Sequence, residues 1–150
     1  MQAIKGYHAH VYFDANTIEQ ARALCERAAQ LFPLKMGRVH ERPVGPHPDW
    51  SCQLAFGPEL IGEVLPWLAL NRKGLVVFLH PDTGDDWVDH TEHAIWMGAM
   101  RTLDLSVFNQ VVDTPDAFLR ARTSAARAQI DFNRIRRSVD RSFKGFARER

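Results

Sequence analysis

The sequence predicts an α+β fold, a ferredoxin-like βαββαβ sandwich with an added long C-terminal helix. Four segments alternate with period two or run as short apolar stretches, which is typical of strands. Two segments with apolar residues three and four positions apart follow the first and third strands, as in a split βαβ unit. A longer helical pattern follows them. We therefore expect residues 1–110 to form the sandwich and residues 111–150 to form a basic amphipathic helical tail.

The first strand is expected at residues 7–13, where polar and apolar side chains alternate. Successive side chains of a strand point to opposite faces, so His8, His10 and Tyr12 share one face. The remaining elements are a helix from the capping-box pair Asn16 and Glu19 to Pro33, strands at 36–44 and 50–56, a helix from Pro58 to Gly74, and a strand at 75–79. Pro66 should kink or restart the second helix, because proline lacks a backbone donor.

This topology brings histidines from distant parts of the sequence together. We expect the first and third strands to be a parallel central pair, with both helices on one face of the sheet and the other face open. His8 and His10 begin the first strand. His80 ends the fourth strand, which runs antiparallel beside the first, and His47 lies in the turn that leads into the third. All four should therefore meet at one edge of the sheet.

Four converging imidazoles indicate a metal site. Neutral imidazole is a common ligand of zinc, iron, copper and nickel, and the H-x-H spacing of His8 and His10 places both rings on one side of a strand. Neither Cys25 nor Cys52 belongs to a C-x-x-C pair, and both are expected to be small buried hydrophobes. Imidazole ligation without thiolates favours a catalytic ion with open positions over a structural ion.

A turn-rich acidic stretch at residues 80–93 is expected to leave the fourth strand and fold back over the histidines. It contains His90 and His93, either of which could act as a general base near neutral pH, oriented by a carboxylate such as Asp89. Its other acidic residues are expected to form turns, because aspartate side chains hydrogen-bond to their own backbone: Asp82, Asp85 and Asp86.

Four motifs, taken in order, resemble the DOPA 4,5-dioxygenase family: YHAHVYFD (7–14), VGPHP (44–48), PWLALNRKGLVVFLHPDTGDDWVDHTEHAIWMG (66–98) and LDLS (103–106). The resemblance covers about residues 5–108. It implies a ferredoxin-like fold and an iron(II)-dependent extradiol dioxygenase. Such an enzyme uses dioxygen to cleave the ring of a catechol such as DOPA or a related dihydroxyphenyl compound.

The resemblance also implies roles for individual residues. The metal ligands are then His8, His10, His47 and His80, binding Fe(II), with zinc or nickel as substitutes in a purified sample. His90 becomes the acid/base candidate, with Asp89 and His93 beside it. Many extradiol enzymes hold iron with two histidines and one carboxylate. Either an all-histidine face binds the ion, or Asp82 or Asp89 joins it.

A catechol substrate needs further contacts. Arg42 and Arg72 are candidates to bind a substrate carboxylate through two parallel hydrogen bonds, and Trp96 is a candidate for contact with the aromatic ring. The small-molecule partners expected are therefore a catechol and dioxygen.

The C-terminal pattern steps by three and four residues across about four heptads: Phe118, Ala121, Ala125, Ala128, Phe132, Ile135, Val139, Ser142 and Phe146. A helix of about 30 residues extends about 45 Å, which is long for so small a body. We therefore expect it to pack against a partner subunit in a homodimer or higher homo-oligomer. Residues 111–150 hold 10 basic and 5 acidic side chains, but their aromatic residues lie in the seam, which argues against nucleic-acid binding.

The composition excludes other classes. The chain has 150 residues, 45% of them hydrophobic and 25% charged, and a net charge of +1, which is ordinary globular composition. No apolar run approaches the ~20 residues of a membrane helix, so we expect a cytoplasmic protein without membrane or nucleic-acid partners. Two alternatives to a dioxygenase stay open: a metal- or ligand-binding ferredoxin-like dimer without turnover, and a structural or regulatory dimer.

Overall fold

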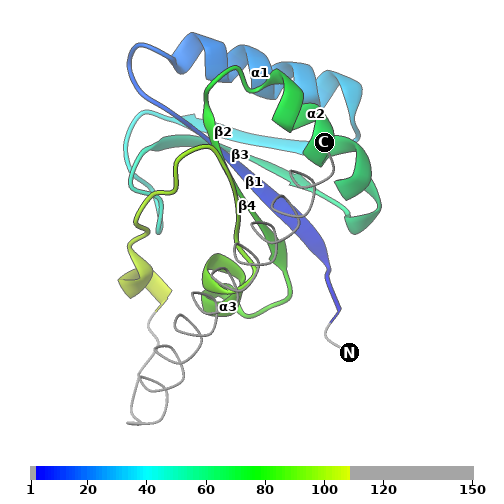
Figure 1. Ribbon diagram of the computed structural model, residues 1–150, viewed down its shortest axis with the longest axis vertical. Coiled ribbons are helices and arrows are strands. Elements are labelled where there is room, and N and C mark those ends of the chain that lie inside the picture. The colour runs from blue at the N-terminus through cyan, green and yellow to red at the C-terminus, as the bar shows by residue number, and fades with distance from the viewer. Residues whose placement is uncertain (1–2, 109–150) are drawn as a thin grey trace, which may run out of the picture. The chain divides into compact units, whose positions relative to one another are not determined.

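The structure is a computed structural model and describes residues 3–108 (Figure 1). The elements in chain order are β1 (Gly6–Phe13), α1 (Ile18–Leu31), β2 (Lys35–His40), β3 (Trp50–Phe56), a 3-10 turn (Pro58–Leu60), α2 (Ile61–Asn71), β4 (Val76–Asp82), α3 (Asp86–Thr91), β5 (Ile95–Met97) and a second 3-10 turn (Leu105–Phe108). The α+β fold is confirmed, and so is the order βαββαβ up to β4. The predicted long helix falls on residues 111–150, which lie outside the described residues.

The five strands form one antiparallel sheet in the order β2-β3-β1-β4-β5. The predicted parallel pairing of the first and third strands is wrong. β1 and β3 are neighbours, but they run antiparallel, with Tyr7 opposite Phe56 and Phe13 opposite Trp50. The physical reason is the connection from β2 to β3, which reverses the chain before β3 begins. The sequence pattern does not predict β5, because three residues are too few to show a period.

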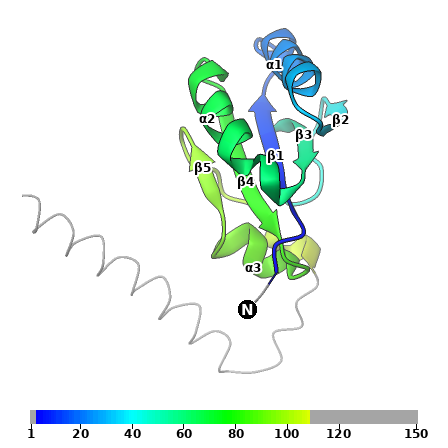
Figure 2. The ribbon, with the colours of Figure 1, turned by 90° about the vertical axis from the view of Figure 1, so that its right-hand side faces the viewer.

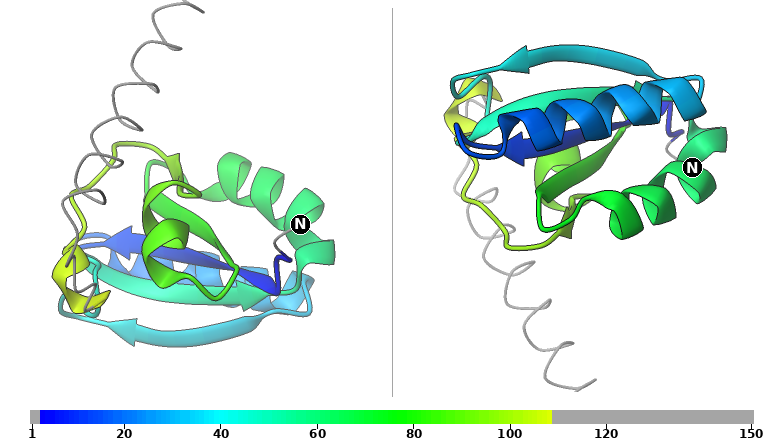
Figure 3. Two further views of the ribbon diagram at one scale, coloured as in Figure 1. Left: turned by 90° about the horizontal axis from the view of Figure 1, so that it is seen from below. Right: turned by 90° about the horizontal axis from the view of Figure 1, so that it is seen from above.

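Helices α1 and α2 pack on one face of the sheet (Figure 2). In the view from above in Figure 3 both helices lie over the strands, and in the view from below α3 lies in front of the opposite face. The core fills the space between the helices and the sheet, and its fully buried members include Ala9, Val11, Ala21, Cys25, Ala28, Cys52, Leu54, Val64, Leu68, Val77 and Leu79. Both cysteines are buried free thiols, as predicted. Among the described residues, no helix combines the length and apolarity needed to span a membrane.

Local details differ from the sequence pattern. The capping box predicted at Asn16 is wrong, because α1 begins after Thr17, which makes no side-chain capping bond. The turn before α1 is closed instead by the Asp14 carboxylate, which accepts hydrogen bonds from the backbone N–H groups of Asn16 and Thr17. β2 ends at His40, earlier than predicted. Pro66 lies inside α2 without interrupting it.

We expect Leu68→Ala to lower the free energy of unfolding by about 2–5 kcal/mol, because the Leu68 side chain is fully buried in the core. Leu70 lies on the same helix but is 84% exposed, so Leu70→Ala should change stability by less than about 0.5 kcal/mol. Urea unfolding of the two variants measures the difference. Equal losses would contradict this orientation of α2.

Candidate metal centre

The face of β1 that is turned away from the helices carries histidines. Ala9 and Val11 enter the core, so the alternation of the strand turns His8 and His10 to the other face. In the antiparallel pairing of β1 with β4, His8 lies directly opposite His80. The ring centroids of His8 and His80 are 5.2 Å apart, and those of His10 and His80 are 5.5 Å apart. Strand pairing therefore brings three imidazoles together.

His47 reaches these rings by a route that the sequence does not predict. Because β3 runs antiparallel to β1, its start lies at the far end of β1 from His8. The turn before β3, in which the His47 N–H donates to the Val44 carbonyl over 3.3 Å, folds back over the open face. The ring centroid of His47 then lies 3.9 Å from that of His10. The four predicted histidines do converge, but on the open face over β1 and β4 and not at an edge of the sheet, and their meeting depends on this turn and not on parallel strands.

A fifth imidazole comes from the segment after β4. This segment is not a loop throughout: β4 continues to Asp82, and α3 follows, capped by the Asp85 side chain as a turn-forming residue. Helix α3 places His90 over the other rings, with its ring centroid 3.9 Å from that of His80. The prediction that this segment folds back over the histidines is confirmed.

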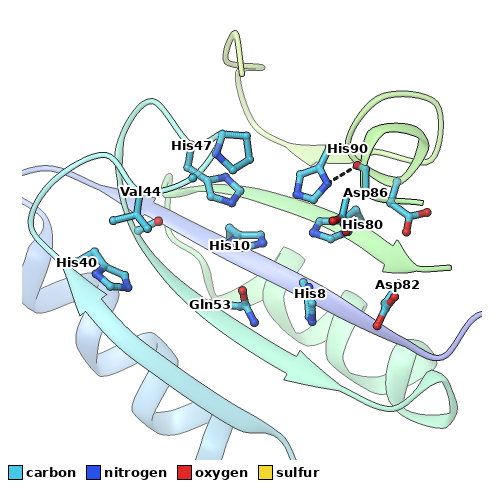
Figure 4. Close-up of a pocket in the computed structure, with 14 residues that line it drawn as sticks. His8, His10, His40, Val44, His47, Gln53, His80, Asp82, Asp86 and His90 are labelled. Carbon is cyan, nitrogen blue, oxygen red and sulfur yellow. Dashed lines mark hydrogen bonds between the residues drawn. The ribbon is translucent and has the colours of Figure 1, made fainter. Parts of the chain in front are cut away.

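These five residues, His8, His10, His47, His80 and His90, are called the histidine cluster. They line a pocket of about 320 Å³ on the open face of the sheet (Figure 4). Two groups of three have one nitrogen each within 4.8 Å of the others: His8, His10 and His80, and His10, His47 and His90. Either group is close enough to hold one metal ion. The carboxylates of Asp82, Asp86 and Asp89 also line the pocket, but neither group includes them.

Hydrogen bonds decide which nitrogen two of these rings present to the pocket. His80 Nδ1 lies 2.8 Å from the Pro81 carbonyl oxygen, and His90 Nδ1 lies 2.7 Å from the Asp86 carbonyl oxygen. A carbonyl oxygen only accepts, so each Nδ1 carries the hydrogen and donates it, and each Nε2 keeps a lone pair. A hydrogen-bond partner of this kind is typical of metal-binding histidines.

Two buried ring nitrogens have no hydrogen-bond partner within residues 3–108, namely Nε2 of His10 and Nε2 of His80. Leaving a buried polar atom unpaired costs about 1–3 kcal/mol. Both residues belong to the group formed with His8, and the lone pair on His80 Nε2 is free to bind an ion there. The residues present therefore fit a metal ion, and imidazole donors suit zinc, iron, copper or nickel.

Burial favours the uncharged form of four of these imidazoles, those of His10, His47, His80 and His90. Desolvation, with a smaller contribution from neighbouring His90, lowers the pKa of His47 to about 3 and the pKa of His80 to about 4. Burial is also the largest cause that lowers the pKa of His10 well below its usual range, and it lowers the pKa of His90. Neutral imidazole is the form that binds metal ions, so these rings are ready to ligate near neutral pH.

The predicted acid/base residues are only partly brought together. The Asp89 carboxylate accepts hydrogen bonds from the Thr83 backbone N–H and hydroxyl, both over 2.7 Å, and lies 3.0 Å from His93 Nδ1. Burial would raise the pKa of Asp89, but these hydrogen bonds outweigh burial and lower it. Asp89 therefore orients His93, which does not line the pocket, and the backbone of Asp86 orients His90.

The predicted substrate residues lie outside the pocket. Arg42 is exposed in the connection after β2. The Arg72 guanidinium donates to the Leu75 carbonyl over 2.9 Å, in the turn between α2 and β4. Trp96 lies on β5, with its ring centroid 4.6 Å from that of Phe78. None of Arg42, Arg72 and Trp96 is among the residues that line the pocket.

One buried side chain at the site has no functional role in the sequence prediction. The Tyr12 hydroxyl oxygen lies 2.7 Å from His47 Nδ1, and the residue is 2% exposed. Burial, and then the negative charge of Asp49, raise the pKa of Tyr12, so the phenol stays protonated. The signal that could have identified it is its position two residues after His10, on the same face of the strand.

Comparison with known sequences decides the family. The sequence model of the Dopa 4,5-dioxygenase family matches residues 7–107. The chain belongs to the DOPA 4,5-dioxygenase family. The part of the chain that matches the DOPA 4,5-dioxygenase family contains the whole histidine cluster.

Two curated relatives and one solved structure are similar to this chain. DOPA 4,5-dioxygenase of Amanita muscaria is 30% identical over 112 residues, covering 69% of this chain and 49% of that protein. An uncharacterized 21.2 kDa protein of Botryotinia fuckeliana is 38% identical over 117 residues, covering 70% of this chain and 64% of that protein. The crystal structure of a candidate dioxygenase from Nostoc punctiforme shares 42% identity with a TM-score of 0.70, covering 72% of this chain and 94% of that one. The chain thus spans about half to two thirds of the curated relatives it matches.

We expect the metal-free protein to lose stability as the pH falls from about 6.5 to about 4. The pKa values of His47 and His80 are about 3 and about 4 when folded, against 6.5 for an ordinary histidine, so the unfolded chain binds more protons in this range. For each proton that the unfolded chain binds beyond the number bound by the folded chain, the free energy of unfolding falls by about 1.4 kcal/mol per unit decrease in pH. Urea unfolding at several pH values, with a chelator present, measures the slope.

His80→Gln should reduce this slope, since it removes one of the buried titrating groups. His40→Gln, a substitution on the edge strand β2 outside the histidine cluster, is the matched control. A slope that His80→Gln leaves unchanged would show that the buried imidazole does not set the pH dependence.

Proposed function

We propose that this chain is a metal-dependent dioxygenase of the extradiol type, which opens the ring of a catechol with dioxygen. The observation that carries this proposal is the pair of buried Nε2 atoms of His10 and His80, which have no hydrogen-bond partner among the described residues and lie in a pocket lined by imidazoles. Membership of the family and the similarity to a candidate dioxygenase support the reaction class.

The proposed ligands are His8, His10 and His80, because this group contains both unpartnered nitrogens. Iron(II) is the proposed metal, and when bound it supplies the open coordination positions and the redox chemistry through which a catechol and dioxygen react. His47, which the sequence predicts as a fourth ligand, belongs to the second group, with His10 and His90.

His90 is the proposed general base. The Asp86 carbonyl oxygen accepts the hydrogen of His90 Nδ1, so Nε2 is the atom that takes a proton from a catechol hydroxyl. The ring centroids of Phe78 and Phe108 lie 5.6 Å and 4.7 Å from the ring centroid of His90, and the two rings shield His90 from water. Burial lowers the pKa of His90, which favours the unprotonated ring that a general base requires.

The proposal is tested with full-length protein loaded with iron(II) under anaerobic conditions. A panel of catechols is added, and oxygen uptake and the absorbance of a ring-opened semialdehyde product are followed. Uptake of one dioxygen per catechol consumed is the expected result. If the protein binds iron but consumes no dioxygen with any catechol of the panel, it is a metal- or ligand-binding protein without turnover.

We expect His80→Ala to reduce metal affinity by at least about 100-fold, because it removes a ligand and not only an outer partner of one. The fold should remain, as judged by circular dichroism. His40→Ala is the control, because His40 lies at the rim of the same pocket but in neither candidate ligand group. Stoichiometric iron bound with wild-type affinity in His80→Ala would contradict the assigned ligands.

A further inference from the structure

Tyr12 is held rigidly beside the histidine cluster. It packs with Val76 and Phe78 in a second apolar cluster on the open face of the sheet, and its ring centroid lies 6.0 Å from that of Trp96. Within residues 3–108 its hydroxyl makes one hydrogen bond, to Nδ1 of His47 over 2.7 Å. The Tyr12 ring therefore has little freedom to move its hydroxyl away from His47.

The partner of His47 differs in kind from the partners of His80 and His90. Those two rings donate to carbonyl oxygens, which fixes their hydrogens on Nδ1. A tyrosine hydroxyl can donate as well as accept. If His47 Nδ1 donated, the buried Tyr12 O–H would have no acceptor among the described residues, and an unmade bond of this kind is costly. Donation from Tyr12 to His47 is therefore favoured.

We propose that Tyr12 is a positioning residue that donates its hydroxyl hydrogen to His47 Nδ1 and so keeps the hydrogen of the neutral His47 ring on Nε2. A ring nitrogen that carries a hydrogen has no lone pair for a metal ion. His47 is thereby a hydrogen-bond donor in the pocket and not a metal ligand. The identity of the group that accepts this hydrogen bond, a catechol oxygen, rests on the proposed function.

This assignment divides the histidine cluster by what each ring offers. His80 and His90 present lone pairs, the first to the metal and the second to a substrate proton. His47 presents an N–H, which can stabilise the negative charge left on a catechol oxygen after His90 has taken its proton. A preorganised donor of this kind is effective because it is already oriented when the charge develops.

The tautomer is tested directly in full-length, metal-free protein by long-range proton–nitrogen-15 NMR of the histidine rings. The signals of His47 are assigned by their loss in His47→Gln. The expected wild-type pattern has the hydrogen on Nε2 and none on Nδ1. A hydrogen on Nδ1 of His47 would overturn the proposal. Tyr12→Phe should shift the Nδ1 resonance of His47, and Tyr7→Phe, which alters a ring stacked on Phe56, should not.

Two binding measurements test whether His47 is a hydrogen-bond donor or a metal ligand. Zinc affinity should stay within about threefold of wild type in Tyr12→Phe and in His47→Gln, since neither change removes a ligand. Affinity of the zinc-loaded protein for 4-nitrocatechol should fall about fivefold in Tyr12→Phe, the loss expected for one hydrogen bond, and not in Tyr7→Phe. A zinc affinity lowered 10-fold or more in His47→Gln, or an unchanged catechol affinity in Tyr12→Phe, would overturn the proposal.

The same measurements on His80→Ala keep the two proposals apart. If zinc affinity falls 10-fold or more both in His80→Ala and in His47→Gln, the proposed metal site stands, but the role proposed for Tyr12 and His47 is wrong. If His80→Ala binds zinc as well as wild type does, the proposed metal site itself is wrong. Circular dichroism of each variant verifies that it is folded.

Discussion

Strand β1 has one apolar face and one histidine-bearing face, and its antiparallel pairing with β4 fixes what each face meets. Ala9 and Val11 are fully buried against the helices, which leaves the strand no freedom to rotate or to slip by one residue. A slip would move the histidines into the apolar core. The register that buries the core therefore also places His8 opposite His80 and brings the imidazoles of the candidate metal centre together.

The buried histidine cluster is costly to the stability of the fold. Two ring nitrogens are buried without a hydrogen-bond partner among residues 3–108, and burial lowers the pKa of His10 and His80. Sites that break local rules of stability are expected where function requires it. Around the rings, backbone carbonyls of Pro81 and Asp86 orient two imidazoles. The turn that carries His47 and the short helix α3 complete a site that the sheet begins.

The sequence predicted the meeting of the histidines, although the expected direction of one strand was wrong. His47 meets the other rings although β3 runs opposite to the expected direction, because the turn after Val44 folds back over the sheet. The sequence pattern does not predict contacts between residues that are distant in the chain. Arg42 and Arg72, predicted to bind substrate, lie outside the pocket. The hydrogen bond between Tyr12 and His47, which was not predicted, joins residues 35 positions apart. Periodicity reports which face a residue occupies, but not which residue from another segment it meets.

The sequence by itself determined the α+β class, the alternation of β1 and the motifs that identify the family, because these depend on residues close together in the chain. Only the tertiary structure decided the antiparallel order of the five strands, the two groups of histidines that share His10, and the hydrogen-bond partner of each ring. These features depend on the packing of segments that are distant in sequence, and side-chain chemistry alone does not specify the direction from which such a segment approaches.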